Sequence, residues 1–344
     1  MTDLFDIAPL DRALEPALRR ALDGKAKPPG SLGRLEDMGV QIALIQQRPD
    51  PSAAHARLLL FAGDHGLTRS GVSQYPAQVT QAMVATLLAG KASANAFART
   101  VGAQVQVIDA GVAADLAPHP LLRDAKVAHG SGDAAVEPAM TPTQAMETLR
   151  RGAQIAREAV DEGVEILALG EMGIGNSASA ALLLHRLGPL PLVRAVGPGA
   201  GHSPDGLARK HAVLAQAAAR TPAVAPLDVL AQFGGFEIAM MAGAILGGAQ
   251  AGAVMVVDGF IATAAALVAA RLAPASMERC VFAHRSAEPG HDAMLALLDA
   301  APLLDLSMRL GEGTGALLAI PLLRAATALL NEVASLDDVL AGRL

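Results

Sequence analysis

The sequence predicts an α/β protein with three layers, in which helices cover both faces of a parallel, Rossmann-like sheet. Two observations support this prediction. Six short apolar segments each end in a loop of glycine and polar residues, and helical stretches lie between them. Strands that alternate with helices form βαβ units, and strands buried on both faces read as continuous apolar runs. The six predicted strands are residues 58–61, 105–108, 166–169, 193–196, 253–257 and 280–283.

Both chain ends are predicted to be helical. Residues 11–23 carry apolar side chains at helical spacing before Gly24, and a second helix runs from about residue 31 to residue 46. Residues 317–330 are also apolar and helix-like. We expect a small helical domain made of residues 1–50 and 317–344, beside an α/β catalytic domain of residues 51–316. Within the latter, the proline-rich residues 112–145 are expected to form loops.

Composition argues against two classes of protein. The chain has 344 residues, a net charge of −6, no tryptophan and one tyrosine, so it lacks the basic face and aromatic platforms of a nucleic-acid binder. The longest apolar stretch, residues 238–260, is interrupted by Gly243, Gln250 and Asp258, among others. We therefore expect no nucleic-acid partner and no membrane span.

The cysteine content and the start of the chain predict a cytoplasmic protein. Cys280 is the only cysteine, so no intrachain disulfide and no cysteine-based zinc site can form. Such a chain suits a reducing compartment. The first six residues are acidic and lack the basic region that opens a secretory signal.

Polar residues follow every predicted strand, and this places the site. Each of the six strands is followed by Gly, Asp, Glu, His, Asn or Ser. In open parallel sheets, ligands bind beyond the carboxyl ends of the strands. We therefore expect one ligand site at that edge of the sheet.

Two of these loops are candidates for binding an anion. Residues 170–177 read Gly-Glu-Met-Gly-Ile-Gly-Asn-Ser and open a helix, whose N-terminal N–H groups favour a phosphate. The loop does not match GxGxxG and no ribose-binding carboxylate follows, so a mononucleotide is indicated; a plain capped turn is the alternative. Residues 197–201 read Gly-Pro-Gly-Ala-Gly, with Lys210 beyond them as a point charge. The alternative for Lys210 is a solvated helix lysine.

Residues 309–316 read Arg-Leu-Gly-Glu-Gly-Thr-Gly-Ala and hold the strongest candidate for catalysis. A carboxylate on a glycine-rich turn between apolar, helix-like flanks at 303–310 and 317–330 suggests that Glu312 is a base held in an apolar pocket. The alternative is a helix–helix turn with an exposed glutamate. Tyr75 and Met83 are suited to line the pocket of a flat apolar ligand, although a core-facing methionine is an alternative.

Asp64, His65, His284 and His291 are the candidates for a metal site. Their spacing matches no ligand pair such as HExxH, so structural hydrogen bonds are the favoured interpretation. We expect no metal.

Taken together, these motifs resemble the nicotinate-nucleotide–dimethylbenzimidazole phosphoribosyltransferase family. The resemblance runs nearly end to end. The motifs that support it are residues 27–36, 62–66, 75–83, 170–176, 234–237, 284–288 and 309–316.

The resemblance implies a homodimer that transfers phosphoribose from nicotinate mononucleotide to 5,6-dimethylbenzimidazole, without cofactor or metal. The apolar residues 234–252 also favour a dimer. The products would be α-ribazole 5′-phosphate and nicotinate. The implied catalytic residues are Glu312 and Glu171; the benzimidazole pocket would contain Tyr75, Met83, Ser286 and Leu310; phosphate and ribose would contact Gly175, Asn176, Ser177, Gly199, Lys210, Gly313 and Thr314.

One departure affects the second anion loop. Many family members are expected to carry Gly-Arg-Gly-Thr-Gly there, whereas this chain has Gly-Pro-Gly-Ala-Gly at 197–201, which removes a cation and a hydroxyl. Its phosphate contacts would therefore come mainly from the backbone. Two other functions stay open: a nucleotide-sensing protein without turnover, and a Rossmann oxidoreductase, against which the missing dinucleotide fingerprint counts.

Overall fold

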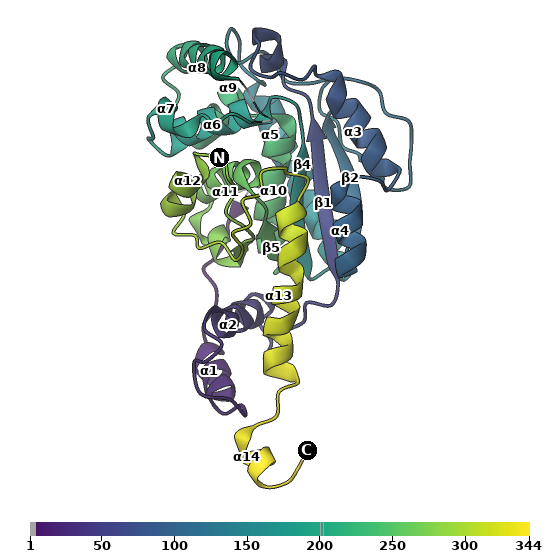
Figure 1. Cartoon of the computed structure of the whole chain (residues 1–344), viewed down its shortest axis with the longest axis vertical. Coiled ribbons are helices and arrows are strands. Elements are labelled where there is room, and N and C mark those ends of the chain that lie inside the picture. The colour runs from purple at the N-terminus through teal and green to yellow at the C-terminus, as the bar shows by residue number, and fades with distance from the viewer. Residues whose placement is uncertain (1–4, 200, 202) are drawn as a thin grey trace.

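The computed structural model describes residues 5–199, 201 and 203–344, and its centre is a six-stranded parallel sheet (Figure 1). The strand order is β3-β2-β1-β4-β5-β6, and all neighbouring strands are parallel. The strands are β1 (Ala56–Gly63), β2 (Gln104–Gly111), β3 (Leu122–Asp124), β4 (Ile166–Met172), β5 (Val254–Val257) and β6 (Cys280–Phe282). This confirms the predicted α/β class and parallel sheet.

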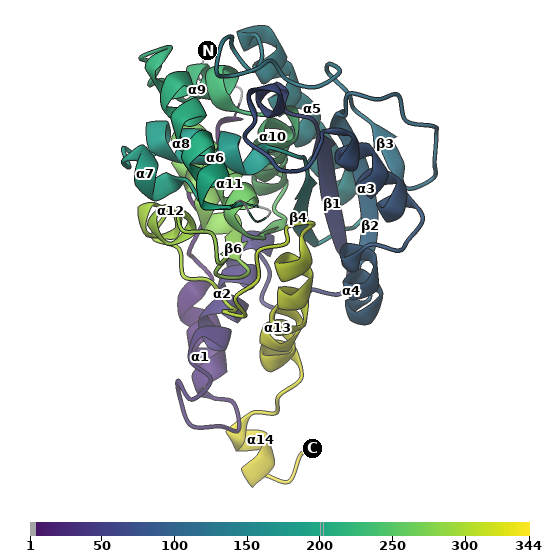
Figure 2. The same ribbon diagram turned by 45° about the horizontal axis from the view of Figure 1, so that its top comes forward.

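Helices cover both faces of the sheet, which gives three layers (Figures 1 and 2). In β1, Leu59 and Phe61 belong to the core beneath α5, α6, α10 and α11, whereas Leu58 and Leu60 belong to the core beneath α3, α4 and α13. The α-helices are α1 (Glu15–Asp23), α2 (Arg34–Gln46), α3 (Gln78–Leu88), α4 (Ser93–Val101), α5 (Pro142–Asp161), α6 (Asn176–Leu187), α7 (Leu192–Ala195), α8 (Pro204–Ala219), α9 (Pro226–Phe233), α10 (Phe236–Gln250), α11 (Phe260–Leu272), α12 (His291–Leu297), α13 (Thr314–Asn331) and α14 (Leu336–Leu340). Two 3₁₀ helices, η2 (Gly66–Ser70) and η3 (Pro274–Arg279), complete the elements.

The strand order reverses between β1 and β4, because the chain first builds outward through β2 and β3 and then returns to continue on the other side of β1. Such a switch point leaves a crevice beyond the carboxyl ends of the two central strands. The loops after β1 and β4 therefore meet where a ligand is expected.

Three sequence predictions were wrong in detail. The apolar run 193–196 falls on the short helix α7, which begins after Pro191 and contacts α6 and α8 instead of joining the sheet. β3 lies in the region predicted as loop; it is a three-residue edge strand with two exposed residues, so it leaves no apolar run. Residues 303–310 are not helical, since they continue beside β6 through bonds such as Leu304 N–H to Ala283 O.

The two chain ends pack together. Leu18 of α1, Leu44 of α2 and Leu329 of α13 share one small apolar cluster, and the Lys25 ammonium donates to the carbonyls of Leu330 and Val333. The first half of α13 belongs instead to the core under the sheet. The contact agrees with a helical unit made from both ends, but the boundaries at residues 50 and 317 stay a prediction.

The apolar stretch 234–252 is accounted for within this chain. It forms α10, whose residues are buried along nearly its whole length, chiefly against α5 and α11. Close backbone contact requires glycine there: a Cβ at Gly243 would overlap Leu149 O, and one at Gly152 would overlap Met240 O. The stretch therefore no longer argues for a dimer.

Only α13, among the described helices, has the length and apolar composition to cross a membrane. Within this fold 61% of its 18 residues are buried, and the helix contacts α2, α4 and β4. α13 is thus a core helix here.

Candidate active site

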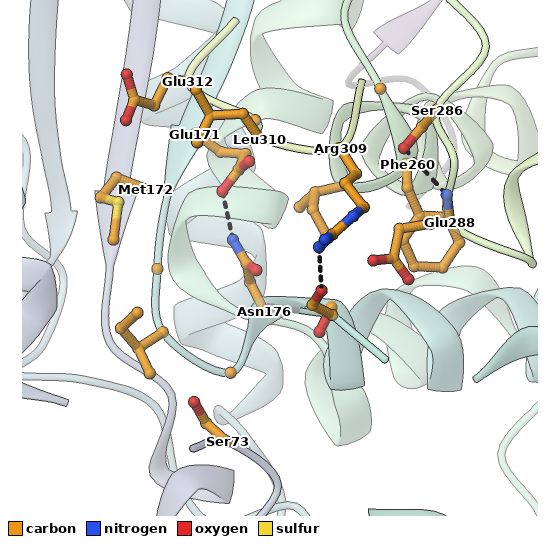
Figure 3. A pocket seen from close by; sticks show the side chains of 18 of the residues that line it. Ser73, Glu171, Met172, Asn176, Phe260, Ser286, Glu288, Arg309, Leu310 and Glu312 are labelled. Atoms are coloured by element: carbon orange, nitrogen blue, oxygen red, sulfur yellow. Dashed lines mark hydrogen bonds between the residues drawn. The ribbon is translucent and has the colours of Figure 1, made fainter. Parts of the chain in front are cut away.

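A cavity of about 410 Å³ opens at the switch point of the sheet, beyond the carboxyl ends of β4, β5 and β6 (Figure 3). Its walls come from residues 72–75 after η2, 171–177 at the end of β4, 258–262 after β5, 284–288 after β6 and 309–312 before α13, together with Met83 of α3 and with Gly199 and Gly201. One wall is mainly apolar and another carries carboxylates and a helix N-terminus. The site lies where the polar strand ends predict it.

The N-terminus of α6 forms the floor on one side of the cavity. Its N-cap, Gly175, has φ +96°, and a Cβ there would lie 2.8 Å from Thr68 Cγ2, so only glycine fits. Gly175, Asn176 and Ser177 all line the cavity. The positive end of the helix dipole makes this wall suited to a phosphate.

Glu171 stands at the end of β4 and is nearly buried. Its carboxylate accepts a hydrogen bond from the Asn176 amide. Burial, reinforced by the negative charges of Glu237 and Asp258, raises the pKa of Glu171 to about 8. At neutral pH this side chain is therefore a carboxylic acid that can donate a hydrogen bond into the cavity.

Glu312 occupies a strained turn. Its φ is +60°, between Gly311 at +89° and Gly313 at +74°, a conformation that costs a non-glycine residue free energy. The turn presses on β4, since a Cβ at Gly170 would lie 2.8 Å from Glu312 O. The Glu312 carboxylate is 5% exposed and accepts from Ala94 N–H at 3.2 Å. This burial excludes the exposed-glutamate alternative, and it also raises the pKa of Glu312.

Asp258 and His284 lie deeper, at the ends of β5 and β6. Asp258 Oδ1 accepts from Ala316 N–H at 2.8 Å and lies 3.7 Å from His284 Nε2. Burial raises the pKa of Asp258 to about 6, against the opposing effect of His284. Both residues line the cavity.

His291 fixes the loop that carries Ser286. Its Nδ1 accepts from Ser286 N–H at 2.7 Å, so the proton resides on Nε2, which donates to Thr263 Oγ1 at 2.9 Å. Burial lowers the pKa of His291 to about 3, so the ring stays neutral in this bonding pattern. The described residues contain no group of three or more His, Cys, Asp and Glu side chains that could hold a metal ion.

Lys210 supports the second anion loop from behind. It is 1% exposed, and its ammonium donates to Ser177 Oγ and to Gly197 O, each at 3.0 Å. This burial excludes the solvated alternative, and it lowers the pKa of Lys210 to about 8. Ala200 of this loop lies outside the described residues.

Arg309 and Glu288 face each other across the same loop (Figure 3). Arg309 Nη1 donates to Gly199 O at 3.2 Å, and the Glu288 carboxylate lies so close to Gly197 that a Cβ there would overlap Oε2. Burial raises the pKa of Glu288, although Lys210 opposes this effect. Arg309 thus places a positive charge beside the loop of residues 197–201, which contains no Lys or Arg of its own.

Comparisons with known proteins agree with this geometry. The model of a phosphoribosyltransferase family matches residues 7–339. A nicotinate-nucleotide–dimethylbenzimidazole phosphoribosyltransferase of Cupriavidus taiwanensis is 52% identical over 332 residues, covering 96% of each chain, and one of Dechloromonas aromatica is 49% identical over 338 residues, covering 97% of each. The crystal structure of CobT from Thermus thermophilus superposes with a TM-score of 0.91 at 43% identity, covering 94% of this chain and 97% of that one.

The chain belongs to this phosphoribosyltransferase family. The resemblance stated from the sequence motifs is thereby confirmed.

Most of the residues that the sequence assigned to this phosphoribosyltransferase site line the cavity. Tyr75 and Leu310 stand half-exposed at its mouth, and Met83 faces it from α3 instead of the core. The predicted residues that line it are Glu171, Glu312, Tyr75, Met83, Ser286, Leu310, Gly175, Asn176, Ser177 and Gly199.

Three predicted residues of the phosphoribosyltransferase do not line the cavity. Lys210 lies behind Ser177. Gly313 packs against β4, where a Cβ would lie 3.1 Å from Gly170 Cα, and the Thr314 hydroxyl donates to Gly311 O at 2.8 Å. Lys210 and Thr314 thus bond to residues that do line it, Ser177 and Gly311.

Sequence reasoning about this phosphoribosyltransferase missed several lining residues. Asp258, His284 and Glu288 follow predicted strands, so their position was a usable signal, but Asp258 and Glu288 were given no role and His284 was considered only as a metal ligand. Arg309 was part of a quoted motif without a role. The function of His291 could not be found from the sequence, because it depends on the Ser286 loop folding back onto α12.

Proposed function

We propose that this chain transfers phosphoribose from nicotinate mononucleotide to 5,6-dimethylbenzimidazole, giving α-ribazole 5′-phosphate and nicotinate for the lower ligand of cobalamin. One observation supports this most directly: two buried glutamates, Glu171 and Glu312, line the same cavity as the N-terminus of α6. A phosphate end and a carboxylate end are what the two substrates require. The relatives bear the name of this activity.

The nucleotide phosphate binds at the N-terminus of α6. Gly175, Asn176 and Ser177 contribute the helix end, and Gly199 contributes the facing loop. Lys210, through Ser177, and Arg309 supply positive charge. Anchoring the phosphate remotely holds C1′ of the ribose in line for attack.

The benzimidazole binds between Tyr75, Met83 and Leu310, with Ser286 at the edge of the pocket. These apolar side chains suit the faces of a flat aromatic base. The half-exposed positions of Tyr75 and Leu310 leave the mouth of the pocket open to a base from solution.

The reaction exchanges one C1′–N bond for another. The pyridinium nitrogen of the donor leaves with the electron pair of its bond to C1′, which converts the cationic ring to the uncharged pyridine ring of nicotinate. One benzimidazole nitrogen attacks C1′ from the opposite face, so a β-nucleotide gives an α-product. The other benzimidazole nitrogen loses its proton to the Glu312 carboxylate, which acts as general base. Glu171, kept protonated by burial, donates a hydrogen bond and does not compete for that proton.

Release of nicotinate tests this function. Protein, nicotinate mononucleotide and dimethylbenzimidazole should yield nicotinate and α-ribazole 5′-phosphate in equal amounts, and omission of the base should abolish both. Binding of the nucleotide without product would favour a nucleotide sensor instead, and hydride transfer with a nicotinamide dinucleotide would favour an oxidoreductase. A panel of benzimidazoles, purines and phenols then identifies the preferred acceptor.

We also infer a cytoplasmic homodimer. The side chains of Tyr75 and Leu310 are exposed at the cavity, where a second subunit would cover them. Cys280 is buried and free, as suits a reducing compartment. Light scattering at micromolar concentration should give twice the chain mass of 34.9 kDa, and a monomer mass would refute the dimer.

A further inference from the structure

A hydrogen-bonded chain of three buried side chains lies one layer beneath the cavity. His65 follows β1, and its Nε2 lies 2.5 Å from Glu237 Oε1 in the first turn of α10. Its Nδ1 lies 2.9 Å from Ser179 Oγ in the first turn of α6. The side chains of His65 and Glu237 have 0% exposed area, and neither lines the cavity. The three side chains thus join β1, α6 and α10 out of contact with solvent.

One tautomer satisfies both ring nitrogens. With the proton on Nε2, His65 donates to the Glu237 carboxylate, and Nδ1 accepts from the Ser179 hydroxyl. Among the described residues, Glu237 Oε2 has no hydrogen-bond partner. Glu237 lies in the first turn of α10, where the positive end of the helix dipole favours its negative charge.

The turn between β4 and α6 rests directly on this pair. A Cβ at Gly173 would lie 3.3 Å from Glu237 Oε1, and one at Gly175 3.3 Å from His65 Cβ. A Cβ at Gly235 would overlap His65 Cε1. Gly173 and Gly175 line the cavity on their other side. A change in the position of His65 or Glu237 would therefore act directly on these glycines of the cavity floor.

We propose that His65 and Glu237 are positioning residues for the phosphoribosyl transfer, holding the β4–α6 turn in the shape that presents Glu171 and the α6 N-terminus to the nucleotide. This inference rests on the proposed function, because it assigns the turn to the nucleotide phosphate. Neither residue touches substrate. Each acts through the glycines that lie between it and the cavity.

The pair also sets the charge beneath Glu171. The groups that face Glu171 are the negative charges of Glu237 from α10, Asp258 from the end of β5 and Glu312 from the turn before α13, together with the Asn176 amide from α6. Asp258 is in turn opposed by His284. After burial, Glu237 has the largest effect in raising the pKa of Glu171. Removing the Glu237 charge while keeping its shape should therefore let Glu171 ionise at lower pH.

The variant Glu237→Gln tests this pair with a readout that packing alone would not move. The kcat of the wild type, at saturating nucleotide, should fall as pH rises through the ionisation of Glu171. In Glu237→Gln that falling limb should move to lower pH by roughly one unit, the order of effect expected from one like charge nearby. Glu171→Gln should lack the limb altogether, which assigns it. The matched control is Glu158→Gln, an exposed ion-pair partner of Arg123, whose limb should not move.

Two further variants keep the proposal testable where Glu237→Gln does not fold. His65→Gln retains a donor for Glu237 but loses the contact with Ser179, and Ser179→Ala removes only the hydroxyl. Both should raise the KM for nicotinate mononucleotide several-fold with little change in the KM for the base, and His65→Gln should retain more activity than His65→Ala. An unmoved limb in folded Glu237→Gln, or a wild-type nucleotide KM in folded His65→Gln or Ser179→Ala, would overturn the proposal. Absence of nicotinate release by the wild type would instead overturn the proposed function.

Discussion

The two glutamates of the cavity differ in backbone, partners and neighbouring charge, although they share one ligand space. Glu171 ends a regular strand, is bonded by Asn176 and faces the acids Glu237 and Asp258. Glu312 sits on a turn with φ +60°, and its burial and its bond from the Ala94 amide are the effects that shift its pKa. Burial, reinforced by the charges of Glu237 and Asp258, raises the pKa of Glu171, whereas the pKa of Glu312 is raised by burial and lowered by the Ala94 amide. These different surroundings support the proposal that Glu171 serves as a hydrogen-bond donor and Glu312 as a base.

The largest effect that would break this comparison is expected at Glu312. Glu312→Gln keeps the size of the side chain but removes the base, so kcat should fall roughly 10²–10⁴-fold while substrate affinities change little. The kcat of the wild type should also fall at acid pH as Glu312 gains a proton, and the variant should lose that acid limb. Steady-state kinetics from pH 4.5 to 9.5, roughly the span in which carboxylates with raised pKa titrate, measures both.

The exposed Glu332→Gln serves as the control for that change. A near-normal kcat in Glu312→Gln would leave positioning as the source of catalysis and would make Glu171 the next candidate base.

The next largest effect is expected at Lys210, which supports the α6 N-terminus from behind Ser177. Lys210→Met keeps the buried stem but removes the ammonium, so the KM for nicotinate mononucleotide should rise roughly 10- to 100-fold, the value of a charge-assisted hydrogen bond. The KM for the base should change far less. Lys91→Met, at an exposed position, is the control. An unchanged nucleotide KM would show that the phosphate binds elsewhere.

A smaller effect is expected at Glu171, and it sharpens the comparison. Because burial raises the pKa of Glu171 to about 8, the side chain is protonated at pH 7, and Glu171→Gln keeps a donor in its place. The kcat should fall only about fivefold at pH 7, the worth of one weakened hydrogen bond. Above pH 8 the wild type should lose activity as Glu171 ionises, and the variant should not.

Lys210 also has a pKa lowered to about 8, but its loss of charge acts on nucleotide binding. The Glu171 limb must therefore be measured at saturating nucleotide. A loss of roughly 10²-fold or more in Glu171→Gln at pH 7, the size expected for a positioned base, would assign to Glu171 the part that we give to Glu312.

The smallest effect is on stability. Asparagine tolerates the left-handed conformation better than glutamate, so Glu312→Asn should raise the free energy of unfolding by about 1 kcal/mol while abolishing activity. Glu171→Asn, on a regular strand, should give no such gain. Urea unfolding of the three proteins checks this difference, and equal stabilities would mean that the turn is not strained.

The regular part of the fold could be predicted from the sequence because it follows from local rules. Buried parallel strands leave apolar runs, and five of the six predicted runs correspond to β1, β2, β4, β5 and β6. Predictions failed where tertiary contacts overrode the local pattern. The run 193–196 looks like a buried strand but falls on the helix α7, which packs against α6 and α8. The edge strand β3 has exposed Arg123 and Asp124, so it gives no apolar signal.

The same distinction separates the site residues that could be predicted from the sequence from those that could not. Glu171, Asn176 and Glu312 follow strands or open helices, so their neighbourhood could be predicted from the switch point alone. The bonds of His291 to Ser286 and of His65 to Glu237 join residues brought together only by folding, the latter pair 172 positions apart in sequence. No local pattern marks them. The roles of Glu171 and Glu312 remain predictions for the experiments above.

The helix α13 connects the Glu312 turn to the cluster formed by the two chain ends. One end of this helix follows Glu312, and its other end reaches Leu329 and Leu330 in the cluster of the chain ends. At 1.5 Å per residue, its 18 residues span roughly 27 Å. Melting of the chain-end cluster would release the C-terminal half of the helix whose first turn anchors Glu312. Heat inactivation should therefore accompany the loss of structure at the chain ends, which stabilise the Glu312 turn through α13 from a distance.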